Sequence, residues 1–224
     1  MSLILHLETA TTVCSVALSQ AGKMLALKEE NKGFTHAEHL TLFIEEVMKM
    51  AGKNFNELNA VAVSKGPGSY TGLRIGVATA KGLCYGLNIP LLAINTLTSL
   101  MYGAQRKHTK DFHFCPMLDA RRMEVYSAIY KHENIIHDTA AIILNENSFS
   151  ALLDQQEVLF FGDGAQKFKE ICKHKQAIFD LTIEPSAANM IDFIHKKFIA
   201  KAFENLAYFE PYYLKEFYSP STPA

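Results

Sequence analysis

The stretch KGPGSYTGLRIG, residues 65–76, has the glycine content of a loop that binds phosphate. A P-loop has a second glycine after four intervening residues, but Thr71 stands at that distance from Gly66. A dinucleotide-binding loop also needs glycine there, with an acidic residue roughly 20 residues further on, and this chain has neither. A nucleophile elbow needs glycines where Pro67 and Thr71 stand. We therefore expect Gly66 and Gly68 to shape a rigid turn that holds no phosphate.

The elements that position this loop follow from apolar periodicity, turn residues and caps. Three strands, a helix, a strand, a helix, a strand and a helix are predicted up to residue 105, and the same order βββαβαβα begins again after Lys110. A capping box, Thr35 with Glu38, opens the first helix. The expected strands are 3–8, 12–19, 23–30, 60–64, 90–94, 114–120, 124–131, 139–145, 157–162 and 177–181, and the expected helices are 35–52, 69–86, 95–105, 147–154, 164–172 and 187–205.

Two successive copies of this order predict an α/β protein with two RNase H-like lobes, as in the actin, sugar-kinase and Hsp70 superfamily. We expect an N-terminal lobe at 1–108 and a C-terminal lobe at 109–217. The Pro- and Ser-rich end, 218–224, is expected to be a disordered tail, and EPYYLK at 210–215 a docking arm.

Composition excludes some classes of function. Hydrophobic residues make up 49% of the 224 residues and charged residues 20%, which is typical of a globular protein, and no apolar run is long enough for a membrane span. The first residues lack the features of a signal peptide, so we expect a cytoplasmic protein. The formal net charge of −1 predicts that the chain does not bind RNA unaided.

In the predicted superfamily the first hairpin of each lobe holds a nucleotide's phosphates in the cleft between the lobes. Here Glu8 stands where an Asp usually positions the metal, and the following turn, 9–12, has neither glycine nor a basic residue. In the second lobe the turn GDGAQKF, with Lys167, is interpreted as a strand-to-helix turn that needs glycine's dihedral angles. We expect no cofactor, and ATP or ADP in the inter-lobe cleft stays open as the alternative.

The helix after the GPGSYTG loop has two unlike faces. Its glycines and alanines gather on one side, where close packing on the sheet is expected, because each helix glycine costs roughly 1 kcal/mol relative to alanine. Cations alternate with aromatic and aliphatic groups on the opposite side, which is typical of a protein interface. The residues predicted at this interface are Tyr70, Arg74, Val77, Lys81 and Tyr85.

Five stretches together resemble the TsaB family, formerly YeaZ: LETATTVCSVAL, THAEHL, KGPGSYTGLRIGVATAKGL, MLDARRMEVYSA and EPYYLK. The resemblance runs nearly end to end. It implies a noncatalytic paralogue of the transferase TsaD, which pairs with TsaD and the ATPase TsaE to place a threonylcarbamoyl group on the adenosine beside the anticodon of tRNA. It implies that tRNA is reached only through the complex. The isolated chain is expected to form a homodimer through the first-lobe helices, with His39 and Leu42 beside the residues named above.

Because the resemblance implies a paralogue of TsaD, the metal-binding residues of TsaD-like proteins can be compared with the residues at the same positions here. TsaD-like proteins carry two metal-binding histidines in N-H-x-x-x-H, whereas Thr96 and Leu100 stand at those positions here. A leucine cannot ligate a metal, so the metal site is predicted to be lost. The older glycoprotease label of the family also lacks support, because His36 and His39 are too close for H-E-x-x-H. An ATPase or small-molecule kinase of the actin-like superfamily is the alternative function.

DARRMEVY remains a family motif with two interpretations. Asp119, Arg121 and Glu124 fall on a strand and its turn. Ion pairing between the lobes is one interpretation, and a contact with substrate or RNA is the other. With Glu8, Gly66 and Gly68, these residues complete the candidate site.

Overall fold

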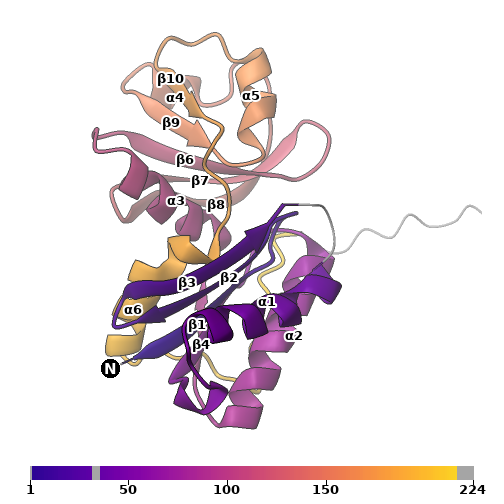
Figure 1. Ribbon diagram of the computed structural model, residues 1–224. Coiled ribbons are helices and arrows are strands. Elements are labelled where there is room, and N and C mark those ends of the chain that lie inside the picture. The colour runs from indigo at the N-terminus through magenta and orange to yellow at the C-terminus, as the bar shows by residue number, and fades with distance from the viewer. Residues whose placement is uncertain (1, 32–35, 216–224) are drawn as a thin grey trace, which may run out of the picture.

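The computed structural model describes residues 2–31 and 36–215, which form two α/β lobes stacked one above the other (Figure 1). The capping box expected at Thr35 and the tail expected at 218–224 lie outside the described residues. Within the described ranges, none of the helices is both long and apolar enough to cross a bilayer.

The first half of the chain forms β1 (Leu3–Glu8), β2 (Cys14–Gln20), β3 (Lys23–Glu30), α1 (His36–Met50), the 3₁₀ helix η1 (Phe55–Glu57), β4 (Ala60–Ser64), α2 (Tyr70–Leu87), β5 (Leu91–Ile94) and α3 (Thr96–Lys107). Its five strands make one mixed sheet in the order β3-β2-β1-β4-β5. β2 is antiparallel to β1 and β3, whereas β1, β4 and β5 run parallel. These three parallel strands are mostly apolar and are buried along their length, because helices cover both faces of the sheet.

The second half forms β6 (His113–Asp119), β7 (Glu124–Lys131), β8 (Asn134–Ile143), α4 (Ser150–Leu153), β9 (Val158–Phe161), α5 (Ala165–Ile171), β10 (Ala177–Asp180), η2 (Ala187–Met190) and α6 (Ile191–Ile199). The sheet order β10-β9-β6-β7-β8 repeats the first topology. The predicted order βββαβαβα in each half is therefore confirmed. The last helix is shorter than expected, because the chain turns at Lys201, whose φ is 53°.

The last helix of each half packs against the sheet of the other half. α3 places Leu97 and Leu100 in a core with Phe114 and Phe161 of the second sheet. In return, α6 and η2 cover the first sheet. Figure 1 shows α3 in the upper lobe and α6 in the lower lobe. The segments 1–108 and 109–217 thus exchange their final helices. The core under α6 contains Ile4, Ala60, Ala62, Leu92, Ile94, Met190 and Ile194.

The exchanged helix α6 provides a stability test. We expect Ile194→Ala to lower the free energy of unfolding by about 2–5 kcal/mol, because the side chain is fully buried against the first sheet and its loss leaves a cavity. Ile199→Ala, one turn later and 67% exposed, is the control and is expected to change stability by about 0.5 kcal/mol or less. Denaturant unfolding of the full chain measures both. Equal losses in the two variants would contradict the packing of α6 on the first sheet.

Candidate functional site

The GPGSYTG loop joins the end of β4 to the start of α2 and packs against two distant segments. The backbone N–H of Ser69 donates to the carbonyl of Ala10, at 2.7 Å. A Cβ on Gly68 would lie 2.3 Å from that carbonyl oxygen. Gly66 has φ +112°, and a Cβ there would lie 2.6 Å from the carbonyl oxygen of Tyr212. Glycine is required at both positions by close approach of backbone, which agrees with the expected rigid turn.

The turn after β1, where the superfamily holds phosphate, is filled by the protein's own groups. The carboxyl group of Glu8 accepts a hydrogen bond from the backbone amide of Ala10 at 2.7 Å. The Thr9 hydroxyl donates to the carbonyl of Gly72 at 2.8 Å, and a Cβ on Gly76 would lie 2.3 Å from that hydroxyl oxygen. A phosphate needs such amides to be free. Here the side chain of Glu8 occupies the Ala10 amide, and α2 seals the turn from solvent.

Two fully buried titratable side chains lie on the same face of β1. Burial raises the pKa of Glu8 to about 7, although the amides of Ala10 and Thr9 oppose the shift. Burial lowers the pKa of His6 to about 3, so its ring is neutral. One ring nitrogen of His6 lies 2.7 Å from the Ser19 hydroxyl. The shifts of Glu8 and His6 therefore have opposite effects on the pH dependence of stability.

The positions of the two metal-binding histidines of TsaD-like proteins are buried in this chain. The Thr96 hydroxyl pairs with that of Ser64 at 2.7 Å, and Leu100 is fully buried in the second core. His39 of the HAEHL stretch is engaged by Glu30, with Nδ1 3.1 Å from the carboxylate. Across residues 2–31 and 36–215, no group of three His, Cys, Asp or Glu residues is arranged to hold a metal ion.

The orientation of α2 differs from the prediction at Val77. This residue was expected on the exposed interface face, but it is only 4% exposed and packs in the first core. Gly72 and Gly76 are buried, and Gly76 faces Thr9 of the turn after β1, whereas in the described part of the chain no atom beyond the helix's own backbone lies within 4 Å of a Cβ on Gly82 or Gly86. The helical wheel placed the buried side of α2 too far round the helix. The side that packs on the sheet is set by the larger apolar residues. That side contains Leu73, Val77, Ala80 and Cys84.

Residues 200–215, the C-terminal arm, cross back over α2. The Lys81 ammonium donates to the carbonyls of Ala207 and Phe209, at 3.3 and 2.9 Å. The ring of Tyr213 lies 4.8 Å from that of Tyr70, centroid to centroid. Lys81 and Tyr70, both expected to face a partner protein, are thus in contact with the arm. Three more contacts fix the arm. Phe209 packs in the first core, and the Tyr212 amide donates to the carbonyl of Lys65 at 2.7 Å. The Lys215 ammonium donates to the Glu124 carboxylate at 2.6 Å.

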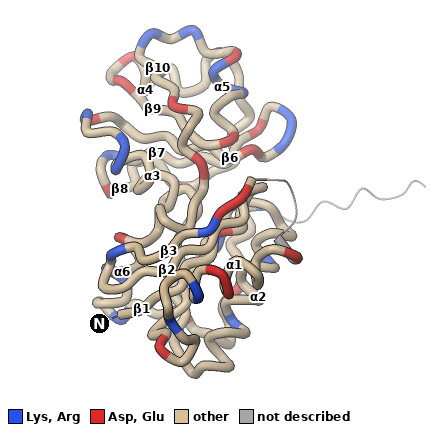
Figure 2. Tube along the Cα trace, viewed as in Figure 1, with Lys and Arg blue, Asp and Glu red and all other residues tan. Residues whose placement is uncertain are grey.

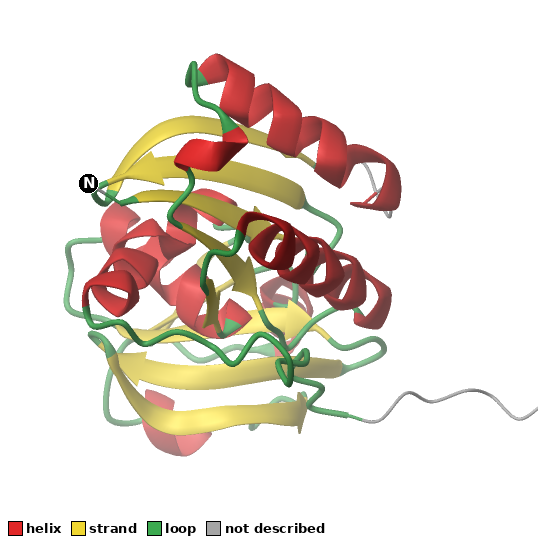
Figure 3. Cartoon of the chain, turned by 90° about the horizontal axis from the view of Figure 1, so that it is seen from below, coloured by secondary structure: helices red, strands yellow, loops and turns green. Residues whose placement is uncertain are grey.

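Other predicted interface residues are exposed. α1 and α2 cover the same face of the first sheet (Figures 1 and 3). Tyr85 is 85% exposed and Leu42 is 54% exposed, whereas His39 is half-buried. We call the outward surface of the two helices the α1–α2 face. It contains Leu42, Met50, Arg74, Ala78, Gly82, Tyr85 and Gly86.

The DARRMEVY motif forms the end of β6, a turn and the start of β7. Asp119 pairs with Lys167 at 2.7 Å and accepts the backbone N–H of Arg121 at 2.6 Å. Glu124 pairs with Lys215 of the C-terminal arm. In the neighbouring GDG turn, a Cβ on Gly162 would meet the carbonyl of Met117 at 2.4 Å. Gly162 has φ +92°, which agrees with the interpretation as a strand-to-helix turn that needs glycine's dihedral angles, and Lys167 is engaged by Asp119.

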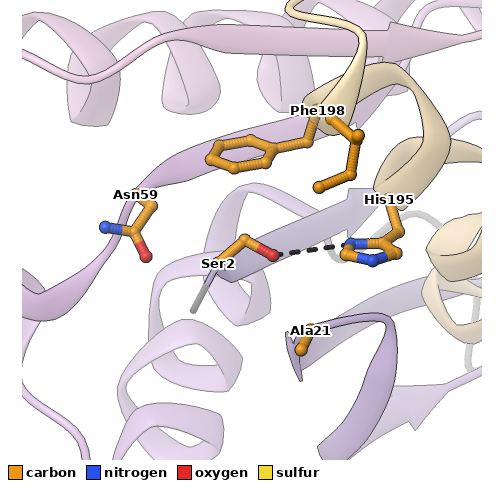
Figure 4. Close-up of a pocket in the computed structure, with 6 residues that line it drawn as sticks. Ser2, Ala21, Asn59, His195 and Phe198 are labelled. Carbon is orange, nitrogen blue, oxygen red and sulfur yellow. Dashed lines mark hydrogen bonds between the residues drawn. The ribbon is translucent and has the colours of Figure 1, made fainter.

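Sequence reasoning missed a pocket of about 530 Å³ at the opposite end of β1 (Figure 4). The Ser2 hydroxyl lies 3.4 Å from Nδ1 of His195, beside Asn59 and Phe198. A hydrolytic triad would need a third group orienting the histidine, and the lining residues include no carboxylate. The pocket depends on α6 returning to the first sheet, which no local sequence signal indicates.

The chain is similar to known proteins over nearly its whole length. A family model described as TsaD, tRNA N6-adenosine threonylcarbamoyltransferase, matches residues 30–220. A protein of Haemophilus influenzae named tRNA threonylcarbamoyladenosine biosynthesis protein TsaB is 27% identical over 95% of this chain and 93% of its own length. The Escherichia coli protein of that name is 29% identical over 95% and 94%.

A solved structure shows the same fold. It is described as an uncharacterized protein from Pseudomonas aeruginosa with similarity to peptidase YEAZ. It is 24% identical, with a TM-score of 0.83, and the superposition covers 96% of this chain and 100% of that one. The expected fold class, α/β with two RNase H-like lobes, is confirmed.

Two glycines of α2 are expected to respond oppositely to alanine. Gly76→Ala should lower the free energy of unfolding by about 1–3 kcal/mol, because its Cβ would collide with the Thr9 hydroxyl. Gly82→Ala should raise it by about 0.5–1 kcal/mol, because the new methyl meets open space inside a helix. Denaturant midpoints measure both. Changes of the same sign would show that the β1–β2 turn does not pack on α2 as described.

Glu8→Gln is expected to alter how stability depends on pH. The carboxyl has a folded pKa of about 7 against an ordinary value of 4.5, so its stabilising contribution is complete below pH 4.5 and is lost as the pH rises to about 7. The loss amounts to about 3 kcal/mol. Because the variant lacks it, its stability relative to the natural chain should rise by that amount between about pH 4 and about pH 8.

Urea unfolding across this range measures the effect. Glu57→Gln is the control, because its exposed carboxylate has a lowered pKa. Glu57 therefore contributes stability above its ordinary pKa that is lost as the pH falls, and the control difference should run the opposite way. A Glu8→Gln difference that is constant with pH would contradict the burial of a titrating carboxyl.

Proposed function

Since the chain belongs to the TsaB (YeaZ) family, within the broader family described as TsaD, we propose that it is a noncatalytic scaffold for threonylcarbamoyl transfer to tRNA. In this role it pairs with a TsaD-type transferase in the cytoplasm, and a TsaE-type ATPase joins the complex. The transfer modifies the adenosine beside the anticodon, and the chemistry belongs to the partner.

The observation that best supports the noncatalytic role is the hydrogen bond from the Ala10 amide to the carboxyl group of Glu8, within the turn that would have to hold the phosphate. A nucleotide phosphate would have to displace this buried group and also separate the Ser69 amide from Ala10. The burial of Thr96 and Leu100, at the metal-ligand positions of TsaD-like proteins, supports the same conclusion. A catalytic paralogue would use these two positions to bind a metal. In this chain, Thr96 instead bonds Ser64 of the first sheet, and Leu100 packs in the core of the second lobe.

The partner surface that we propose is the α1–α2 face. It combines exposed apolar groups such as Leu42 and Met50 with two glycines, Gly82 and Gly86, that leave the backbone of α2 open to close approach. Tyr85 supplies an exposed aromatic group, a type enriched at interfaces. The same face can pair with itself about a two-fold axis, so a homodimer is expected when no TsaD is present.

The alternative is an ATPase or small-molecule kinase with its nucleotide in the inter-lobe cleft. The engaged amide of Ala10 and the lack of glycine or a basic residue in the turn 9–12 weigh against it. A melting shift of several degrees with ATP and magnesium, abolished by Glu8→Ala, would favour that alternative.

Co-purification with the same organism's TsaD-type protein tests the scaffold. Gly82→Glu places a long charged side chain on the α1–α2 face, where nothing lies within 4 Å, and it removes a helix glycine, so the fold is retained. We expect pairing and threonylcarbamoyl transfer to tRNA to fall at least about tenfold, since an unpaired charge at an interface costs more than about 1.4 kcal/mol.

Ile199→Glu is the matched control, because it adds the same charge at an exposed site on α6. Pairing should survive in this variant. If the natural chain does not pair with TsaD, the scaffold proposal fails. If Gly82→Glu pairs normally, the partner binds elsewhere.

A further inference from the structure

The turn between β6 and β7 holds two consecutive arginines in an uncommon backbone conformation. Arg121 has φ 69° and Arg122 has φ 47°. Tight hairpin turns with two such residues usually contain Asn-Gly or a similar pair, because a Cβ is disfavoured there. Two hydrogen bonds hold the turn. The Arg121 amide donates to the side-chain carboxylate of Asp119 at 2.6 Å, and the Glu124 amide donates to the carbonyl of Arg121 at 3.1 Å. It therefore presents both arginine side chains from a fixed base.

The carboxylates that flank the turn are already paired with other cations. Lys167 binds Asp119 at 2.7 Å, and Lys215 of the C-terminal arm binds Glu124 at 2.6 Å. Both arginine side chains are exposed, and within the described ranges neither guanidinium forms an ion pair. The two lysines balance Asp119 and Glu124, and the carboxylate of Asp163, which accepts the backbone N–H of Asp119 at 3.0 Å, offsets one arginine, so the turn keeps a local excess of one positive charge. This excess stands out in a chain whose formal net charge is −1.

We propose that Arg121 and Arg122 bind the phosphate backbone of RNA. A guanidinium presents a planar fork of donors that matches phosphate geometry, and its charge persists at every physiological pH. The turn projects from the edge of the upper lobe as a blue loop (Figure 2) and does not line the pocket beside Ser2 and His195. A convex tip contacts an extended polyanion better than it encloses a small ligand. Given the proposed function, the RNA is the tRNA brought to the complex.

The test uses Arg121→Gln with Arg122→Gln, which removes two charges at exposed positions. Lys173→Gln with Lys175→Gln is the matched control, because it removes two exposed charges from another turn of the same lobe. Each full-length variant is titrated with unmodified tRNA as the complex with the TsaD-type partner. It is also titrated alone at low salt, where phosphate contacts are strong enough to detect binding that the net charge of −1 disfavours at physiological salt. Partner pairing is measured separately by co-purification.

We expect the arginine variant to bind tRNA at least about tenfold more weakly. The slope of log affinity against log salt should become shallower by about two, roughly one for each lost phosphate contact. The control should match the natural chain, and pairing with TsaD should be intact. Equal tRNA affinity in both variants would overturn the inference, as would equal loss in both. Loss of pairing in the arginine variant would also overturn it, because the turn would then be a protein contact.

The two proposals fail separately. If the natural chain does not pair with TsaD, but tRNA binding by the isolated chain depends on the arginines, the RNA contact stands and the scaffold role falls. If pairing holds and tRNA binding ignores the arginines, the scaffold role stands alone.

Discussion

The close approach of the β1–β2 turn to the start of α2 is the constraint on which the rest of the structure depends. Glu8 fixes the turn by accepting the Ala10 amide, and Gly68 and Gly76 allow the loop and helix to touch it. This contact sets the angle of α2. The angle in turn buries Val77 and leaves Gly82 facing solvent. A turn that holds phosphate in related folds is here a packing contact, and α2 presents Gly82 and Gly86 on its opposite, exposed side.

Two further connections make the lobes one unit. α3 and α6 each complete the core of the lobe formed by the other half of the chain. The C-terminal arm then passes the GPGSYTG loop and ends with Lys215 on Glu124 of the second sheet. The three stretches singled out in the sequence, GPGSYTG, DARRMEVY and EPYYLK, thus meet along one continuous path. A rigid body of this kind suits a protein that positions another more than one that closes its lobes on a substrate.

Local patterns were sufficient to predict the order of elements, the fold class and the turn role of Gly66 and Gly68. They failed where the answer depended on residues distant in sequence. Val77 was placed on the wrong face because a helical wheel gives the spacing of residues and does not show which ridge meets the sheet. Tyr70 and Lys81 were expected to face a partner because nothing near them indicates that residues 207–213 return to cover them. The carboxylate of Glu8 was recognised as unusual, but its capture of the Ala10 amide needed coordinates.

The exchanged helices also bear on how the chain folds as it is synthesised. β5 ends at Ile94 and α6 begins at Ile191, so about 100 residues separate the last strand of the first sheet from the helix that covers it. At roughly 5–20 residues per second, the ribosome takes about 5–20 s to add them. During that interval Ile4, Ala62 and Leu92 have no cover from their own half of the chain. The first lobe can therefore complete its core only after α6 has been synthesised.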